Sequence, residues 1–139
     1  MGDERFTALA RELAERDREL PAQLADAARH AERLREHAAA CVAAFCASAR
    51  AEGAAHLTAI HVGPVEPDEK HVDCCQFRIE RGRWLAVCVA KAKGVATLVG
   101  PFQRGKSEGP CRDVAFDAAD ALEALETVLL ALLRVASER

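Results

Sequence analysis

The side chains with the widest chemical range in this sequence are six cysteines and five histidines. His37 precedes Cys41 by four residues, and His71 precedes Cys74 by three. A spacing of four places two side chains on one face of a helix, and imidazole and thiolate are ligands that zinc prefers. Yet the sequence has no Cys-x2-Cys pair, and neighbours such as Cys74 and Cys75 point to opposite faces of a strand. His71 and Cys74 are therefore weak metal candidates, and we expect no metal and no other cofactor.

A cysteine nucleophile needs a histidine base, and the nearest combination is Cys74 with His71 or His61. No third residue that would orient the base stands out in the sequence. The sequence therefore favours a protein without enzymatic activity. A metal- or thiol-dependent enzyme is kept as the second alternative function.

Residues 100–107 match the spacing of a phosphate-binding loop, Gly-x-x-x-x-Gly-Lys-Ser. That loop requires a helix beginning at its Lys-Ser pair, so that backbone amides and the helix dipole face the phosphate. Here Glu108, Gly109 and Pro110 follow, and they cannot continue a helix. We expect no nucleotide hydrolysis, although basic side chains and exposed amides could still bind an anion.

Basic residues are concentrated in the middle of the chain. Residues 76–112 carry eight basic and two acidic side chains, whereas the segments on either side are acidic. This asymmetry supports an alternative function, an anion- or nucleic-acid-binding module, with candidate residues Arg78, Lys93, Arg104, Lys106 and Ser107. Stacking of bases needs exposed aromatic rings, but only Trp84 and Phe102 are available there. A solvated set of turn and edge residues explains the same charges.

These residues lie in or beside a predicted meander of three strands between Val72 and Val99. Apolar and polar residues alternate in each run, which is typical of half-buried strands. Loops of three residues at 80–82 and 92–94, each ending in glycine, would join the strands. They would pair Phe77 with Leu85 and Val87 with Val99. The large aliphatic residues would then share one face, made of Cys75, Phe77, Ile79, Leu85, Val87, Val89, Val95 and Val99.

The first fifty residues have a heptad pattern, which predicts one long helix over about 3–51. Pro21 lies inside it, so the helix should kink or break there. A helix this long would extend about 70 Å, far beyond a domain with a radius of gyration near ~14 Å. We therefore expect a homodimer, coiled-coil-like, with interface residues Phe6, Leu13, Leu20, Leu24 and Leu34. An intramolecular helical hairpin is the alternative.

The remaining elements follow from turn residues and periodicity. We predict a strand over 56–62, loops over 63–70 and 100–109, a short edge strand over 111–116 and a helix over 117–136. The predicted fold is α+β: a long N-terminal helix kinked or broken at Pro21, an antiparallel four- to five-stranded sheet, and a C-terminal helix packed on one face. Residues 1–52 form the helical segment, and residues 53–139 add the sheet and last helix within a single compact domain.

Length and composition narrow the class of protein. A chain of 139 residues can bury a core without disulfides, and six cysteines without a secretion signal indicate reduced thiols in the cytoplasm. No apolar run is long enough to span a membrane, and the richness in alanine and arginine suggests a bacterial source. The sequence favours a cytoplasmic, non-enzymatic interaction or oligomerisation domain, with a second copy or another protein as partner rather than a nucleic acid or a membrane.

Overall fold

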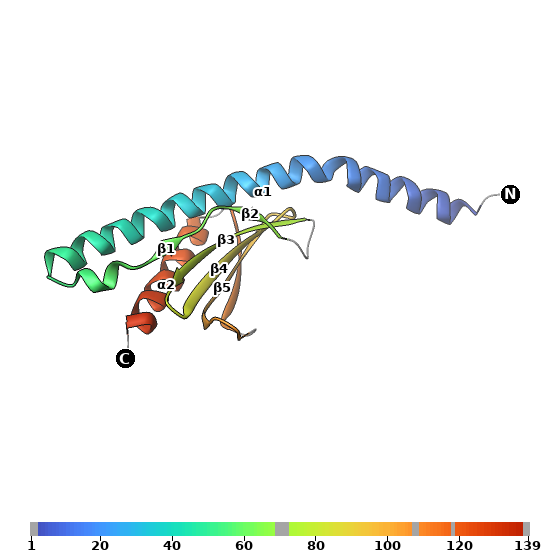
Figure 1. The fold of residues 1–139 in the computed structure, drawn as a ribbon. Helices are drawn as coiled ribbons and strands as arrows, with labels where there is room; N and C mark the ends of the chain where they lie inside the picture. The colour runs from blue at the N-terminus through green and yellow to red at the C-terminus, as the bar shows by residue number, and fades with distance from the viewer. Residues whose placement is uncertain (1–2, 69–72, 107–108, 118, 138–139) are drawn as a thin grey trace.

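The computed structural model describes residues 3–68, 73–106, 109–117 and 119–137. It has a long N-terminal helix, an antiparallel sheet and a C-terminal helix packed on that sheet, so the predicted α+β fold is confirmed (Figure 1). The elements in chain order are α1 (Glu4–Ala51), the 3-10 helix η1 (Ala55–Thr58), β1 (His61–Val62), β2 (Glu66–Pro67), β3 (Cys74–Arg81), β4 (Trp84–Lys91), β5 (Val95–Gln103), β6 (Cys111–Ala115) and α2 (Ala119–Ser137).

All pairings in the sheet are antiparallel, and its strand order is β1-β3-β4-β5-β6, with β2 also paired to β3. The long strands β3, β4 and β5 form the predicted meander, and β6 is the predicted edge strand. The two short strands β1 and β2 share the other edge. The sheet therefore has six strands, two of which contain only two residues.

The first hairpin of the meander has a different register from the predicted one. Arg81 pairs with Trp84, and Phe77 lies opposite Cys88 instead of Leu85. The loop has two residues rather than three, because Gly82 has φ +60° and occupies the first central position of the turn, as a type II′ turn requires. The second hairpin has the predicted three-residue loop, and Val87 pairs with Val99.

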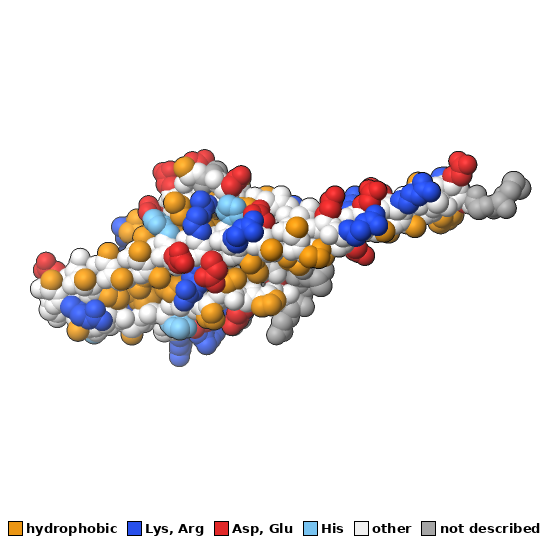
Figure 2. All heavy atoms as spheres, turned by 90° about the horizontal axis from the view of Figure 1, so that it is seen from above, with side chains coloured by type: hydrophobic (Ala, Val, Ile, Leu, Met, Phe, Trp, Pro, Cys, Tyr) orange, Lys and Arg blue, Asp and Glu red, His pale blue; other side chains and the backbone are white. Residues whose placement is uncertain are grey.

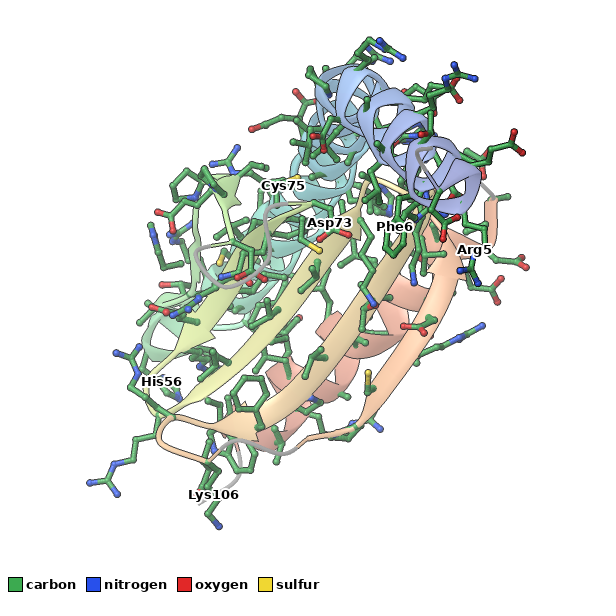
Figure 3. All side chains as sticks on the ribbon, turned by 90° about the vertical axis from the view of Figure 1, so that its right-hand side faces the viewer. Arg5, Phe6, His56, Asp73, Cys75 and Lys106 are labelled. Atoms are coloured by element: carbon green, nitrogen blue, oxygen red, sulfur yellow. The ribbon has the colours of Figure 1, made fainter. Side chains whose placement is uncertain are left out.

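The partner of Phe77 is thus three residues further along β4 than predicted, and because this shift is an odd number, it reverses the faces of β4 and β5 relative to β3. Phe77 and Ile79 share the helix-covered face with small residues of the neighbouring strands, Ala86, Cys88, Ala90 and Ala96, and with Leu98. The prediction was therefore wrong for Leu85, Val87, Val89, Val95 and Val99, which lie on the face that the helices leave uncovered. Figure 3 looks onto that face, with α2 behind the strands.

Small residues line the contact between the helices and the sheet. Ala27, Ala31 and Ala38 of α1 and Ala121 and Ala124 of α2 are almost completely buried, and so are the alanines of β4 and β5 that face them. Small side chains on both surfaces allow the helix backbones to approach the sheet closely. Phe77, Ile79, Leu98, Leu125, Leu129 and Leu132 fill the remaining space of this shared core.

Helix α1 has the predicted bounds and continues through Pro21. Figure 1 shows that it bends in its N-terminal third, as expected where a proline removes one helical hydrogen bond. Its buried residues, Ala27, Ala31, Leu34, Ala38, Val42, Cys46 and Ala49, are spaced every three to four positions. After Ala38 the buried positions move from the heptad residues Cys41 and Phe45 to Val42 and Cys46, because a straight helix has 3.6 residues per turn rather than 3.5.

Three further predictions need correction. The segment predicted as a strand over 56–62 is mostly the 3-10 helix, and only His61 and Val62 pair with β3. The predicted loop at 100–109 begins later, because β5 continues to Gln103 past an irregularity opposite Ala86. Gly100 makes this continuation possible: its φ is +118°, and a Cβ there would lie 2.9 Å from the Cα of Ala86. The predicted loop 63–70 contains β2.

Candidate functional site

The first candidate surface is the N-terminal part of α1, residues 4–23, which we call the overhang. It projects beyond the sheet and α2 (Figure 1). Phe6, Leu9 and Leu13 lie on one side of it and are 70%, 48% and 48% exposed. Figure 2 shows hydrophobic side chains along one edge of the projecting helix and charged side chains along the other. The overhang is therefore amphipathic but has no covering partner within the described chain.

The apolar stripe of the overhang continues the stripe that the core buries. At 100° per residue, Phe6, Leu9 and Leu13 fall on the same side of α1 as Ala27, Ala31 and Leu34. Of the five predicted interface residues, Phe6 and Leu13 are exposed, Leu20 and Leu24 are half-buried, and Leu34 is completely buried. Leu34 packs in the chain's own core and so is not available to a partner.

The candidate anion-binding residues do not converge. Lys93 lies in the turn between β4 and β5, where the neighbouring Ala92 donates a hydrogen bond to the carbonyl of Asp73. Figure 3 shows Lys106 at the opposite end of the sheet from Asp73. Arg104 forms an ion pair with Glu80 at 3.2 Å. The basic residues are thus distributed along the sheet and are partly neutralised.

Arg78 and Ser107 complete the predicted anion set. Arg78 lines a shallow pocket together with Glu66 and Glu80, whose carboxylates oppose the binding of an anion. Ser107 lies outside the described residues. Within the described residues, the segment that resembled a phosphate-binding loop is strand up to Gln103, followed by a turn, so no helix dipole points at Gly100.

The weak metal pair His71 and Cys74 is only half described, because His71 lies outside the described residues. The Cys74 thiol is buried and lies 3.4 Å from a carboxylate oxygen of Asp73, to which it donates. Burial, followed by this hydrogen bond and the negative charge of Asp73, raises the pKa of Cys74 to about 11. Cys74 is therefore a neutral thiol near pH 7 and a poor nucleophile.

The structure brings together a different set, His37, Cys41 and Glu126. His37 and Cys41 are one turn apart on α1, and Glu126 extends from α2, which packs beside it. Nε2 of His37 lies 2.7 Å from Oε1 of Glu126 and 3.7 Å from Sγ of Cys41. The three donor atoms all lie within 4.8 Å of one another. Sequence spacing indicated the first two residues but missed Glu126, because nothing local predicts which residues of α2 face α1.

Burial is the larger cause that raises the pKa of the Cys41 thiol, and the nearby negative charge of Glu126 raises it further. A thiol in this setting is neutral unless a cation compensates its charge. Beside it, Cys41, Phe45, Glu126, Leu129, Leu130 and Leu133 line an apolar pocket. The cluster thus places its donor atoms at the edge of this apolar pocket, where small solutes can reach them.

The geometry of this cluster differs from that of a catalytic triad. In a triad the acid and the nucleophile contact different nitrogens of the histidine, so that one nitrogen is oriented while the other takes the proton. Here both contacts involve Nε2 of His37. A carboxylate that occupies the same nitrogen competes with the thiol instead of orienting the ring. The arrangement therefore favours three ligands around a common point over a nucleophile and its base.

Among the described residues, no helix is both long and apolar enough to cross a membrane. Comparisons with protein-family models, with curated proteins and with solved structures find no match for this chain. The overhang and the cluster formed by His37, Cys41 and Glu126 are the two candidate functional sites of this chain.

Proposed function

We propose that this protein is a non-enzymatic, cytoplasmic interaction domain that forms a homodimer through its overhang. The observation that carries the proposal is the exposed stripe of Phe6, Leu9 and Leu13 on the part of α1 that extends past the core, where none of the described residues covers it. Two copies, placed with their overhangs side by side, would bury this stripe.

Helix stability supports a covering partner. The overhang is about 20 residues, or about 30 Å, long, and it continues the part of α1 that packs on the sheet. In globular proteins most helical stability comes from packing of the apolar face. The core buries that face completely only from Ala27 onward, and Leu20 and Leu24 before it are half-buried. The N-terminal turns of α1 therefore need an apolar surface from another chain to remain helical most of the time.

The charges of the overhang are matched better by a second copy of this chain than by an unrelated partner with a strong net charge. Residues 3–20 carry six acidic and four basic side chains, with both signs distributed along the helix, so a copy of the same helix offers charges of both signs for pairing. An antiparallel arrangement keeps the two sheet-containing bodies at opposite ends of the helix pair. It also produces the isologous interface that is most common in dimers.

The test is the molar mass of the full chain at micromolar concentration, measured by sedimentation equilibrium or by light scattering. We expect a dimer, and we expect Leu13→Lys to shift it to the monomer, since a charge would face the apolar stripe. Ala8→Lys is the matched control, because Ala8 is exposed on the opposite side of the same helix and the variant adds the same charge. A monomeric wild-type chain, or equal loss of the dimer in both variants, would contradict the proposal.

A further inference from the structure

The cluster between α1 and α2 has a property that self-association does not explain. A soft thiol, an imidazole and a carboxylate come from two helices and place their donor atoms within 4.8 Å of one another. An interhelical hydrogen bond between His37 and Glu126 requires no third group. Cys41 is nevertheless placed within 3.7 Å of the same nitrogen.

One of the separations between these atoms matches a tetrahedral zinc site, and a second can reach it by rotation of a side chain. With Zn–N near 2.0 Å and Zn–S near 2.3 Å, two ligand atoms at a tetrahedral angle lie about 3.3–3.6 Å apart. The distance from Nε2 of His37 to Sγ of Cys41 is 3.7 Å, so this pair already has that spacing. The distance from Nε2 to Oε1 of Glu126 is 2.7 Å, and a rotation of the exposed Glu126 side chain would lengthen it sufficiently.

The supporting elements are two helices that pack on the sheet. His37 and Cys41 are four residues apart in the part of α1 that packs on the sheet, between the buried residues Leu34 and Val42. Glu126 follows the buried Leu125 of α2. Ligands on packed helices are held more accurately than ligands on loops, so binding would require rotation of side chains and no movement of the backbone.

We propose that His37, Cys41 and Glu126 form a zinc-binding site that joins α1 to α2. The donor set of one thiolate, one imidazole and one carboxylate is typical of zinc rather than of magnesium or calcium, which prefer oxygen ligands. On binding, the thiol of Cys41 releases its proton to solvent, and its sulfur forms a bond to the metal. The hydrogen bond from Nε2 of His37 to Glu126 breaks, and the neutral ring binds the metal through Nε2 as the tautomer that carries its proton on Nδ1. Three protein ligands leave a fourth position for water or a small ligand, on the side of the apolar pocket formed with Phe45 and Leu129.

The experiment is a titration of the full chain, in reduced form and freed of metal, with cobalt(II) chloride and then zinc chloride. Cobalt reports on the site by its colour, because a thiolate ligand produces an ultraviolet charge-transfer band and a tetrahedral site produces intense visible bands. We expect one cobalt ion per chain, both kinds of band, and displacement of cobalt by zinc.

Variants identify the ligands. Cys41→Ser should abolish the charge-transfer band. His37→Gln and Glu126→Gln should each weaken zinc binding by at least about tenfold, because loss of a residue that only hydrogen-bonds to a metal ligand already lowers metal affinity about 10- to 100-fold. The matched controls are Cys111→Ser and Glu123→Gln. Cys111 is an exposed thiol on β6, and Glu123 is an exposed carboxylate one turn before Glu126. Circular dichroism of each variant checks that it folds.

Three results would overturn the proposal: no charge-transfer band in the wild-type chain, a band that persists in Cys41→Ser, or a band that is lost in Cys74→Ser instead. The last result would move the site to the pair His71 and Cys74. The inference does not depend on the homodimer. The ligands lie outside the overhang, so zinc binding should be unchanged in Leu13→Lys.

Discussion

Nε2 of His37 lies 2.7 Å from Oε1 of Glu126, although 89 residues separate them in the chain. This contact connects the N-terminal helix α1 to the C-terminal helix α2. The side chains of His37 and Glu126 are both partly exposed there. It also brings Glu126 into reach of Cys41. Much of what can be tested in this protein follows from that junction and from the uncovered end of α1.

Without metal, the pair of His37 and Glu126 should contribute little to stability. Exposed ion pairs are worth about 0–1 kcal/mol, and both side chains are partly exposed. We expect Glu126→Gln to lower the free energy of unfolding by less than about 1 kcal/mol in the presence of a chelator. Urea unfolding followed by circular dichroism measures this, and a much larger loss would mean that the pair is a structural contact in its own right.

Zinc should stabilise the wild-type chain. A ligand that binds only the folded state at 100 times its dissociation constant adds about 2.7 kcal/mol, so Tm should rise by several degrees. The effect should be absent in Cys41→Ser and retained in Cys111→Ser. Differential scanning calorimetry with zinc and with chelator makes the comparison. An equal rise in both variants would indicate binding elsewhere.

Zinc affinity should increase with pH. The pKa of Cys41 is raised by burial and by the charge of Glu126, so the free thiol is protonated near neutral pH. The metal displaces that proton. Below the pKa of the thiol, each pH unit should therefore strengthen binding about tenfold for one released proton. Competition with a chelator of known affinity between pH 6 and pH 8 tests this, and a flat profile would exclude Cys41 as a ligand.

Removal of residues 1–20 should abolish the dimer but leave the body folded. The buried positions of α1 begin at Ala27, so the truncation removes no core side chain. We expect a monomer whose thermal transition remains cooperative. Sedimentation and calorimetry on the same sample test both points together. A truncated chain that remained dimeric would place the interface on the sheet or on α2.

Thiol reactivity tests the register of the first hairpin. In the structure Cys88 faces the helices and burial raises its pKa to about 12, whereas Cys111 is exposed. Cys111 should therefore react with a thiol reagent at once, and Cys88 only after unfolding. A three-residue loop at 80–82 would have placed Cys88 on the uncovered face. Mass spectrometry of the labelled peptides identifies each site, and early labelling of Cys88 would contradict the register.

Gly100 should tolerate no side chain. In Gly100→Ala the new Cβ would approach backbone atoms of Leu85 and Ala86 to 2.9 Å, at φ +118°. Gly105→Ala is the control, because its φ is +90° and no atom lies within 4 Å of the added Cβ. Both variants carry backbone strain of about 1–2 kcal/mol, but only Gly100→Ala also forces β4 and β5 apart. Equal unfolding free energies of the two variants would show that the contact is relaxed easily.

The sequence alone was enough to predict the elements with strong local signals. The heptad and helical patterns correctly indicated α1 and α2, and alternation together with glycine turns indicated the meander and β6. Such signals are local, because the period of apolar residues reports whether a segment is a helix or a strand. They also marked His37 and Cys41 as neighbours on one face of a helix.

Only the tertiary structure decided which faces meet. One residue more or less in the turn at Gly82 sends Leu85 and Val87 to the helices or away from them, and both loops fit the same residues. Likewise, the position of Glu126 beside His37 depends on how α2 rotates and slides against α1. That docking is set by the packing of alanines and leucines throughout the core, which no short stretch of sequence encodes.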